Sequence, residues 1–174
     1  DGAGIQLEIA PDFFKEHILA TGQSTDNEKR ICVGMIFLPR TDYSKQEKCR
    51  EIIESALLEE NYNIYGWRQV PINPSILGKT ADQNRPEIAQ VMFKKNEKLK
   101  TNDLERDLFE TRKKIEKVAR QNQLDELYIC SFSSRSIVYK GMFLAEMLSE
   151  FYPDLNDKKL TSRFAVFHQR YSTN

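Results

Sequence analysis

Hydrophobic residues along this chain recur with two different periods, one typical of strands and one typical of helices. Ile5, Leu7 and Ile9 share one side of an extended segment whose other side is polar, which indicates a half-buried strand. The nearly continuous apolar run that ends at Pro39 favours a strand covered on both faces. These patterns predict strands at 4–9, 31–39, 64–71, 87–93, 127–132, 136–141 and 163–169.

A second group of segments has the spacing of amphipathic helices. From Ser44 onward, apolar residues recur at i, i+3, i+4, i+7 and i+8 while charged residues fill the other face. Pro11 suits a first helical turn, where its missing N–H costs nothing, and Asp103 can cap a long helix. Helices are therefore predicted at 11–20, from Ser44 onward, at 103–123 and at 142–152, and an extended loop at 71–78.

The order of these elements predicts the class of fold. Strands and helices alternate irregularly, and the strands on either side of residues 133–135 look like a neighbouring pair. Because no regular β-α-β rhythm is present, we expect an α+β sandwich of antiparallel or mixed sheets with helices outside. A chain of 174 residues has the size of one domain and can bury roughly 70% of the surface of its unfolded form.

Charge and composition exclude several classes of function. Lys plus Arg equals Asp plus Glu at 26 each, and no basic stripe is present, which argues against nucleic acid as a partner. No apolar run is long enough to cross a membrane, and the first residues lack the pattern of a secretion signal. The three cysteines form no C-x-x-C pair, which indicates a reducing compartment, and with only two histidines we expect no metal site.

Few residues have a pattern that suggests catalysis. Cys32 lies within an apolar strand, so we interpret it as a buried structural residue, and the same holds for Cys49 and Cys130. The charges of residues 103–126 fit a solvated helix face. The glycines at positions 2 and 4 are weak evidence for a phosphate-binding loop, because no helix follows them directly.

Residues 168–174, His-Gln-Arg-Tyr-Ser-Thr-Asn, form the densest group of hydrogen-bonding side chains. They follow the last predicted strand, where a rigid element can present donors to a small polar ligand. Arg170 has the planar fork that binds a carboxylate through two parallel hydrogen bonds. An ordinary loop after an edge strand has the same composition, so from these residues alone both interpretations stay open.

Six segments, taken in order, resemble a known family over nearly the whole chain. They are 1-DGAGI-5, 33-VGMIFLP-39, 66-GWRQVPINPSILG-78, 129-ICSFSSRSIVYKGM-142, 151-FYPDL-155 and 168-HQRYSTN-174. Together they resemble the amino-terminal class II glutamine amidotransferase domain of glutamate synthase large subunits. The resemblance implies a four-layer α/β/β/α sandwich of the amino-terminal-nucleophile hydrolase type, incomplete at both ends. It also implies hydrolysis of glutamine to glutamate and ammonia, for transfer of the ammonia to 2-oxoglutarate.

The resemblance also implies roles for individual residues. In this family the arginine of the H-x-R motif binds the α-carboxylate of glutamine and a threonine beyond it helps to hold the substrate, which corresponds to Arg170 and Thr173. By position, Asn174 and, with weaker support, Tyr171 complete the substrate pocket. We expect His168 to support the end of its strand rather than to transfer protons.

The chain departs from the family pattern at the nucleophile. The family uses an amino-terminal cysteine whose own α-amine serves as the base, whereas residue 1 is aspartate and Cys32 lies inside the chain. We therefore expect residues 1–174 to be a single partial domain, cut through the substrate pocket, with no catalytic residue and no activity alone. Lost neighbouring strands should leave unpaired edges at 4–9 and 163–169, exposed apolar faces, and marginal stability or self-association.

For the full-length enzyme the resemblance implies FMN, an iron–sulfur cluster and an electron donor, none of whose motifs lies in this chain. The implied partners are the rest of the synthase chain and a small electron-transfer subunit or ferredoxin, in the cytoplasm or the plastid stroma. Two alternatives stay open. One is a non-catalytic regulatory or interaction module that keeps the fold, and the other is an amidotransferase that makes amino sugars or purines, which the stretches 66–78 and 129–142 disfavour.

Overall fold

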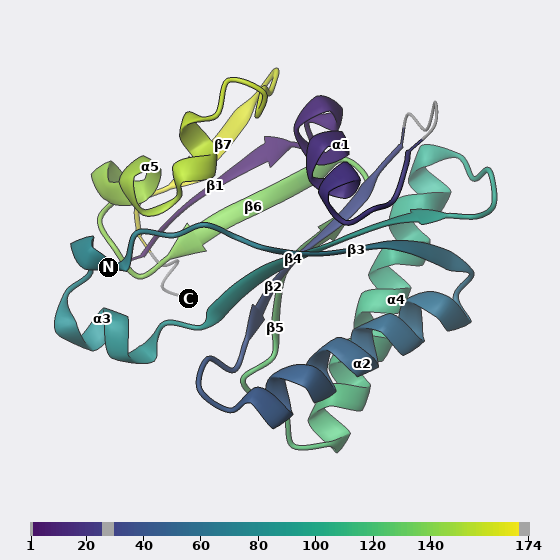
Figure 1. The fold of residues 1–174 in the computed structure, drawn as a ribbon, viewed down its shortest axis with the longest axis horizontal. Coiled ribbons are helices and arrows are strands. Elements are labelled where there is room, and N and C mark those ends of the chain that lie inside the picture. The colour runs from purple at the N-terminus through teal and green to yellow at the C-terminus, as the bar shows by residue number, and fades with distance from the viewer. Residues whose placement is uncertain (1, 26–29, 171–174) are drawn as a thin grey trace.

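A computed structural model describes residues 2–25 and 30–170, which form two antiparallel sheets with helices packed against them (Figure 1). The four-stranded sheet has the order β3-β4-β2-β5 and the three-stranded sheet the order β6-β1-β7. The strands of the first are β2 (Cys32–Leu38), β3 (Tyr62–Gln69), β4 (Glu87–Lys95) and β5 (Tyr128–Ser133). Those of the second are β1 (Ala3–Glu8), β6 (Ser136–Gly141) and β7 (Ala165–His168).

Two long helices cover one face of the four-stranded sheet. The helices are α1 (Pro11–Ala20), α2 (Tyr43–Glu59), α3 (Lys79–Asn84), α4 (Thr101–Gln121) and α5 (Leu148–Phe151), with short 3₁₀ turns at Pro74–Ile76, Ala145–Met147 and Pro153–Asn156. In Figure 1, α2 and α4 run side by side beneath this sheet. Ile53 of α2, Leu108 of α4 and Phe93 of β4 are fully buried in the core between them. This amphipathic packing confirms the helices predicted from Ser44 onward and at 103–123, but α4 begins at Thr101 with Lys100 at its N-cap, so the predicted cap at Asp103 is wrong.

A second core lies between the two sheets. Met35 of β2, Met92 of β4 and Tyr139 of β6 meet there and are fully buried. Helix α1 inserts Phe14 and Ile18 into the same core. The structure therefore has a mixed α/β architecture with two antiparallel sheets, and the fourth layer of the expected sandwich stays a prediction.

The segment 142–152 differs from its prediction as one helix. It contains only a 3₁₀ turn and the four-residue α5. The ring of Phe143 folds back against Gly141, where a Cβ atom would lie 2.3 Å from the ring, so the chain turns sharply instead of entering a helix. The short α3 is a further difference, because the sequence pattern predicted no helix after the loop at 71–78.

Two predictions about strand pairing are wrong. Strands β5 and β6 belong to different sheets, so residues 133–135 carry the chain from one sheet to the other. Glu105 of α4 accepts hydrogen bonds from both hydroxyl groups of this turn, at Ser133 and Ser134. Strand β1 pairs with β6 on one side and β7 on the other, so residues 4–9 do not lack a partner.

The prediction of exposed apolar residues around 163–169 is confirmed. Strand β7 is the edge of its sheet, and all four of its residues are exposed. Val166 is 60% exposed and Phe167 is 67% exposed, even though the sequence alternates as in a half-buried strand. In the described part of the chain, no element covers these two side chains enough to bury them.

Candidate functional site

The first and last segments of the family resemblance lie side by side in the three-stranded sheet. Gly4 of β1 is the direct partner of His168 of β7, so their side chains share one face of the sheet. A Cβ atom on Gly4 would lie only 2.5 Å from Nε2 of His168 and 2.8 Å from Cβ of Lys140. Glycine at this position therefore makes room for the imidazole ring.

His168 also contacts the backbone that follows it. Its Nδ1 lies 3.1 Å from the carbonyl oxygen of Arg170. Arg170, Gln169 and His168 line an open hollow of about 610 Å³, together with Gly4 and Ile5 of β1 and residues from Leu144 to Leu148. The structure thus brings Arg170 to a cavity beside β1.

The structure describes one of the predicted substrate-binding residues. Arg170 is exposed at the hollow. Tyr171, Thr173 and Asn174 lie outside the described residues, so their roles stay predictions.

A second, more enclosed hollow of about 400 Å³ borders the same histidine. Its lining is mostly apolar and includes Leu77, Phe143 and Phe151, together with Lys140. His168 therefore lies between a polar hollow and an apolar one. This arrangement suits a small ligand with one charged end and one less polar end.

A buried ion pair lies between the two sheets. Arg68 donates to both carboxylate oxygens of Asp154, at 2.7 and 2.5 Å, and both side chains are less than a tenth exposed. Tyr139 donates to Asp154 at 2.9 Å. Gln90 accepts a hydrogen bond from Arg68 and donates one to Tyr139.

This buried network was missed by the sequence reasoning, although a signal was present. Arg68, Tyr139 and Asp154 belong to three different segments of the family resemblance. A charged residue inside an otherwise apolar segment, as in Phe-Tyr-Pro-Asp-Leu, needs a partner when it is buried. The network therefore gives the polar residues of these three segments a structural role, because each satisfies a buried partner.

His17 of α1 lies beside this network. Burial lowers the pKa of His17 from its ordinary value of 6.5, and the positive charge of Arg68 lowers this pKa further. Its ring packs edge-on against Phe13, with ring centroids 4.6 Å apart. Phe13 also lies under the guanidinium of Arg68. His17 is therefore favoured in its neutral form.

Two of the three cysteines, Cys32 and Cys49, are fully buried, which confirms their interpretation as buried residues, whereas Cys130 is partly exposed. Cys32 is fully buried in the middle of β2. Burial raises the pKa of Cys49 to about 11 and that of Cys130 to about 12. A nucleophilic cysteine needs a lowered pKa, so both thiols stay protonated near neutral pH.

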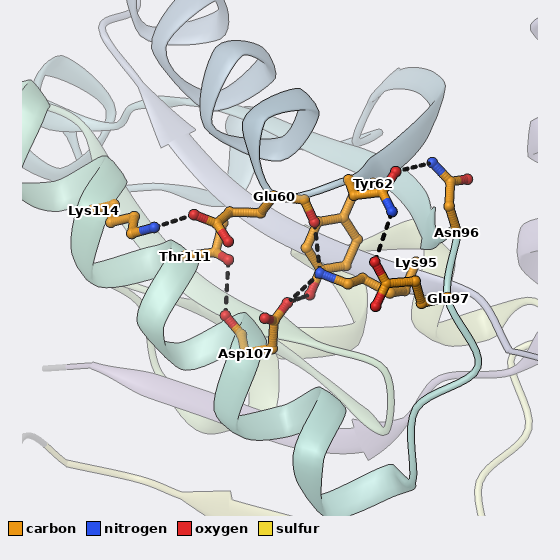
Figure 2. A network of polar contacts seen from close by, with 9 residues as sticks. Glu60, Tyr62, Lys95, Asn96, Glu97, Asp107, Thr111 and Lys114 are labelled. Atoms are coloured by element: carbon orange, nitrogen blue, oxygen red, sulfur yellow. Dashed lines mark hydrogen bonds and ion pairs between the residues drawn. The ribbon is translucent and has the colours of Figure 1, made fainter.

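A third polar cluster joins α4 to β3 and β4 of the four-stranded sheet (Figure 2). Tyr62 of β3 donates to Asp107 of α4 at 2.5 Å, and Lys95 of β4 donates to the same carboxylate oxygen at 2.9 Å. Lys95 also donates to the backbone oxygen of Glu60 and lies over the Tyr62 ring. Burial and the hydrogen bond to Asp107 raise the pKa of Tyr62. The bonds from Tyr62 and Lys95 to Asp107 join α4 to the sheet.

Over residues 2–25 and 30–170, no helix combines the length and the apolar character needed to cross a bilayer. In the same ranges, no three His, Cys, Asp or Glu residues come together as metal ligands would.

Comparison of the sequence with known proteins shows its family. The chain is 49% identical to the glutamate synthase [NADPH] large chain of Azospirillum brasilense and 42% identical to the ferredoxin-dependent glutamate synthase 1, chloroplastic/mitochondrial, of Arabidopsis thaliana. Each match covers the whole chain but 11% of the relative's length. The family model of class-II glutamine amidotransferases matches residues 1–174. The chain therefore belongs to the class-II glutamine amidotransferases.

Proposed function

We propose that residues 1–174 form part of the glutaminase domain of a glutamate synthase. In this role the domain binds glutamine and releases glutamate and ammonia, and the full-length protein transfers the ammonia to 2-oxoglutarate. The names of the two relatives described above support this assignment. Residues 1–174 are then one partial domain of a longer chain.

The observation that carries the proposal is the position of Arg170. Its guanidinium belongs to the H-x-R segment of the family resemblance and lines the hollow beside β1. A planar guanidinium binds a carboxylate through two parallel hydrogen bonds. We propose that Arg170 binds the α-carboxylate of glutamine, and that Thr173, Asn174 and Tyr171 complete the pocket.

We propose that the attacking thiol belongs to a part of the full-length protein outside residues 1–174. The support is the state of the thiols within them, since Cys32 is fully buried and the pKa values of Cys49 and Cys130 are raised. A thiol with a pKa of about 11 is ionised in only about one molecule in ten thousand at pH 7. The isolated chain is therefore expected to hydrolyse no glutamine.

We propose that FMN and an iron–sulfur cluster bind elsewhere in the full-length protein. An iron–sulfur cluster needs several thiolates at one place. The three cysteines lie on β2, α2 and β5, and in the described ranges no cluster of three metal-ligating side chains forms. The described residues therefore do not fit such a cluster.

We propose that the electron donor, a reduced nicotinamide nucleotide or ferredoxin, also contacts other parts of the protein. The two relatives are named for NADPH and for ferredoxin, which supports both donors equally. A partner electron-transfer subunit and a location in the cytoplasm or the plastid stroma belong to the same proposal.

The test is glutamine hydrolysis by the full-length protein and by its Arg170→Ala variant. We expect the unchanged protein to release glutamate from glutamine, and Arg170→Ala to raise KM for glutamine by 100-fold or more, since a charged hydrogen-bond pair is lost. Arg163→Ala is the matched control, because the exposed Arg163 pairs with the half-buried Glu8 at the opposite end of β1 from Gly4 and does not line this hollow. Equal KM values for both variants would refute the role of Arg170.

The same assay separates the alternative of a non-catalytic module. Such a module also shows no reactive thiol within residues 1–174, so the isolated chain cannot distinguish the two. Full-length protein that binds its other substrates but never consumes glutamine would favour the module. Ammonia release from the isolated chain would contradict the proposed position of the nucleophile.

A further inference from the structure

The structure assigns to His168 a positioning role. Its imidazole packs against Gly4 and hydrogen-bonds the backbone of Arg170, so that the guanidinium of Arg170 faces the substrate carboxylate. This inference rests on the proposed function, because it concerns the same glutamine site. It adds a residue whose side chain acts through Arg170 rather than on the substrate.

The imidazole of His168 packs against Gly4 of β1. Gly4 and His168 are direct partners in the antiparallel pair of β1 and β7. The space that a Cβ atom of Gly4 would fill is taken by the ring, since the nearest ring atom, Nε2, would be only 2.5 Å away. Lys140 of β6 closes the other side, with its Cβ 2.8 Å from the same point. The imidazole is thus held between two neighbouring strands.

The imidazole also contacts the backbone of Arg170. A carbonyl oxygen can only accept a hydrogen bond, so the 3.1 Å contact requires a proton on Nδ1 of His168. Nδ1 then donates to the carbonyl oxygen two residues ahead and closes the bend that follows β7. The imidazole thus contacts the bend through Nδ1 and packs against Gly4 on its other side.

The end of the chain segment that carries His168 is exposed. Strand β7 is an edge strand, and its residues 165–168 are all exposed. Burial therefore contributes little to holding the end of β7, so the bond from His168 to the backbone of Arg170 carries more weight there. Misplacing a substrate-binding group by about 1 Å can cost up to about 100-fold in the rate of reaction.

The test compares amide replacements of His168 in the full-length protein. The side-chain nitrogen of asparagine lies about as far from Cβ as Nδ1 does, whereas that of glutamine lies one bond farther away. We expect His168→Ala and His168→Gln to raise KM for glutamine by about 10- to 100-fold with kcat changed by less than about threefold. His168→Asn should restore KM to within about threefold of the unchanged protein.

A second variant tests the contact between Gly4 and the imidazole while His168 is kept. Gly4→Ala places a methyl group where the ring lies, so we expect it to raise KM as much as His168→Ala does. The double variant should be no worse than either single variant, because both remove one contact. Val166→Thr is the control, since Val166 lies on the same face of β7 two residues earlier and is 60% exposed.

The outcomes separate this inference from the proposed function. If the unchanged protein hydrolyses glutamine and Arg170→Ala raises KM, but the asparagine and glutamine variants behave alike, the positioning role is refuted and the function stands. A fall in kcat at unchanged KM would also refute it, because it would indicate proton transfer by His168. If the unchanged protein does not hydrolyse glutamine, both proposals fail together.

Discussion

Removing the carboxylate of Asp154 should destabilise the fold more than any surface change. In Asp154→Ala the guanidinium of Arg68, whose side chain is 9% exposed, loses both of its carboxylate bonds. Breaking one partner of a buried ion pair costs about 3–5 kcal/mol, because the remaining charge stays buried without compensation. Gln90 still accepts one bond from Arg68, which places the expected loss toward the lower half of this range.

The assay is urea unfolding followed by the fluorescence of Trp67, the single tryptophan of the chain, which lies next to Arg68 on β3. With a slope of about 2 kcal/mol per molar urea, a loss of about 3–4 kcal/mol corresponds to a fall of about 1.5–2 M in the midpoint. Asp154→Asn keeps the shape but loses the charge, so its midpoint should lie between those of the unchanged chain and Asp154→Ala.

Replacing both partners of the buried ion pair tests whether the unpaired charge causes the loss. In Arg68→Met with Asp154→Leu no buried charge is left, and replacing a whole buried pair with apolar residues is often neutral. The double variant should therefore recover most of the stability that Asp154→Ala loses. Glu51→Gln, at an exposed pair with Lys48, is the control and should cost no more than about 1 kcal/mol. If Asp154→Ala lowered the midpoint no more than Glu51→Gln does, the reasoning would be wrong.

Three further predictions concern other residues. The pKa of His17 is lowered from 6.5 on folding, so the unfolded chain takes up a proton first as the pH falls. The free energy of unfolding should therefore decrease below about pH 6.5. In urea titrations at several pH values, His17→Gln should reduce this dependence on pH. Asp107→Ala leaves Lys95, 9% exposed, without its carboxylate partner and should cost about 1–3 kcal/mol by the same unfolding assay. Cys49 and Cys130 should react with a thiol reagent at pH 7 only as the chain unfolds, because burial raises both pKa values.

Each of these predictions has an outcome that contradicts it. Stability that rises as the pH falls from 7 to 5, and does so only when His17 is present, would reverse the expected sign. Glu16→Ala, at an exposed pair with Lys159, should change stability by no more than about 1 kcal/mol, so an equally small effect of Asp107→Ala would remove the role of the cluster. Rapid labelling of either thiol in native buffer would contradict their burial.

Local sequence signals predicted the elements whose stability is mainly local. Helix α1 begins at Pro11 and ends at Ala20, as expected from the proline at its first turn and the apolar residues Phe14 and Ile18 that face the core. Strand β6 occupies Ser136–Gly141, the predicted range. In these elements, local propensity and the final packing favour the same structure.

Long-range packing decided the elements that the sequence did not predict. Residues 142–152 have the apolar content of a helix, but they form only a 3₁₀ turn and α5, with Phe143 and Phe151 buried in the core between the sheets. The alternation in β7 looks half-buried, yet burial depends on a covering layer that a local pattern cannot reveal. The pairing of Gly4 with His168 was equally hidden, although both residues belong to segments that suggested the family.

The three-stranded sheet joins the two extremes of the described chain, and this has a consequence for the order of folding. The bond from Glu8 to Ser162 spans 154 positions and that from Gln6 to Ser136 spans 130, whereas the four-stranded sheet is built from residues between 32 and 133. Closing such long loops is slow, because their entropy is lost before any contact compensates for it. The bend that carries Arg170 therefore takes shape last, after the rest of the protein has a surface on which β1 and β7 can meet.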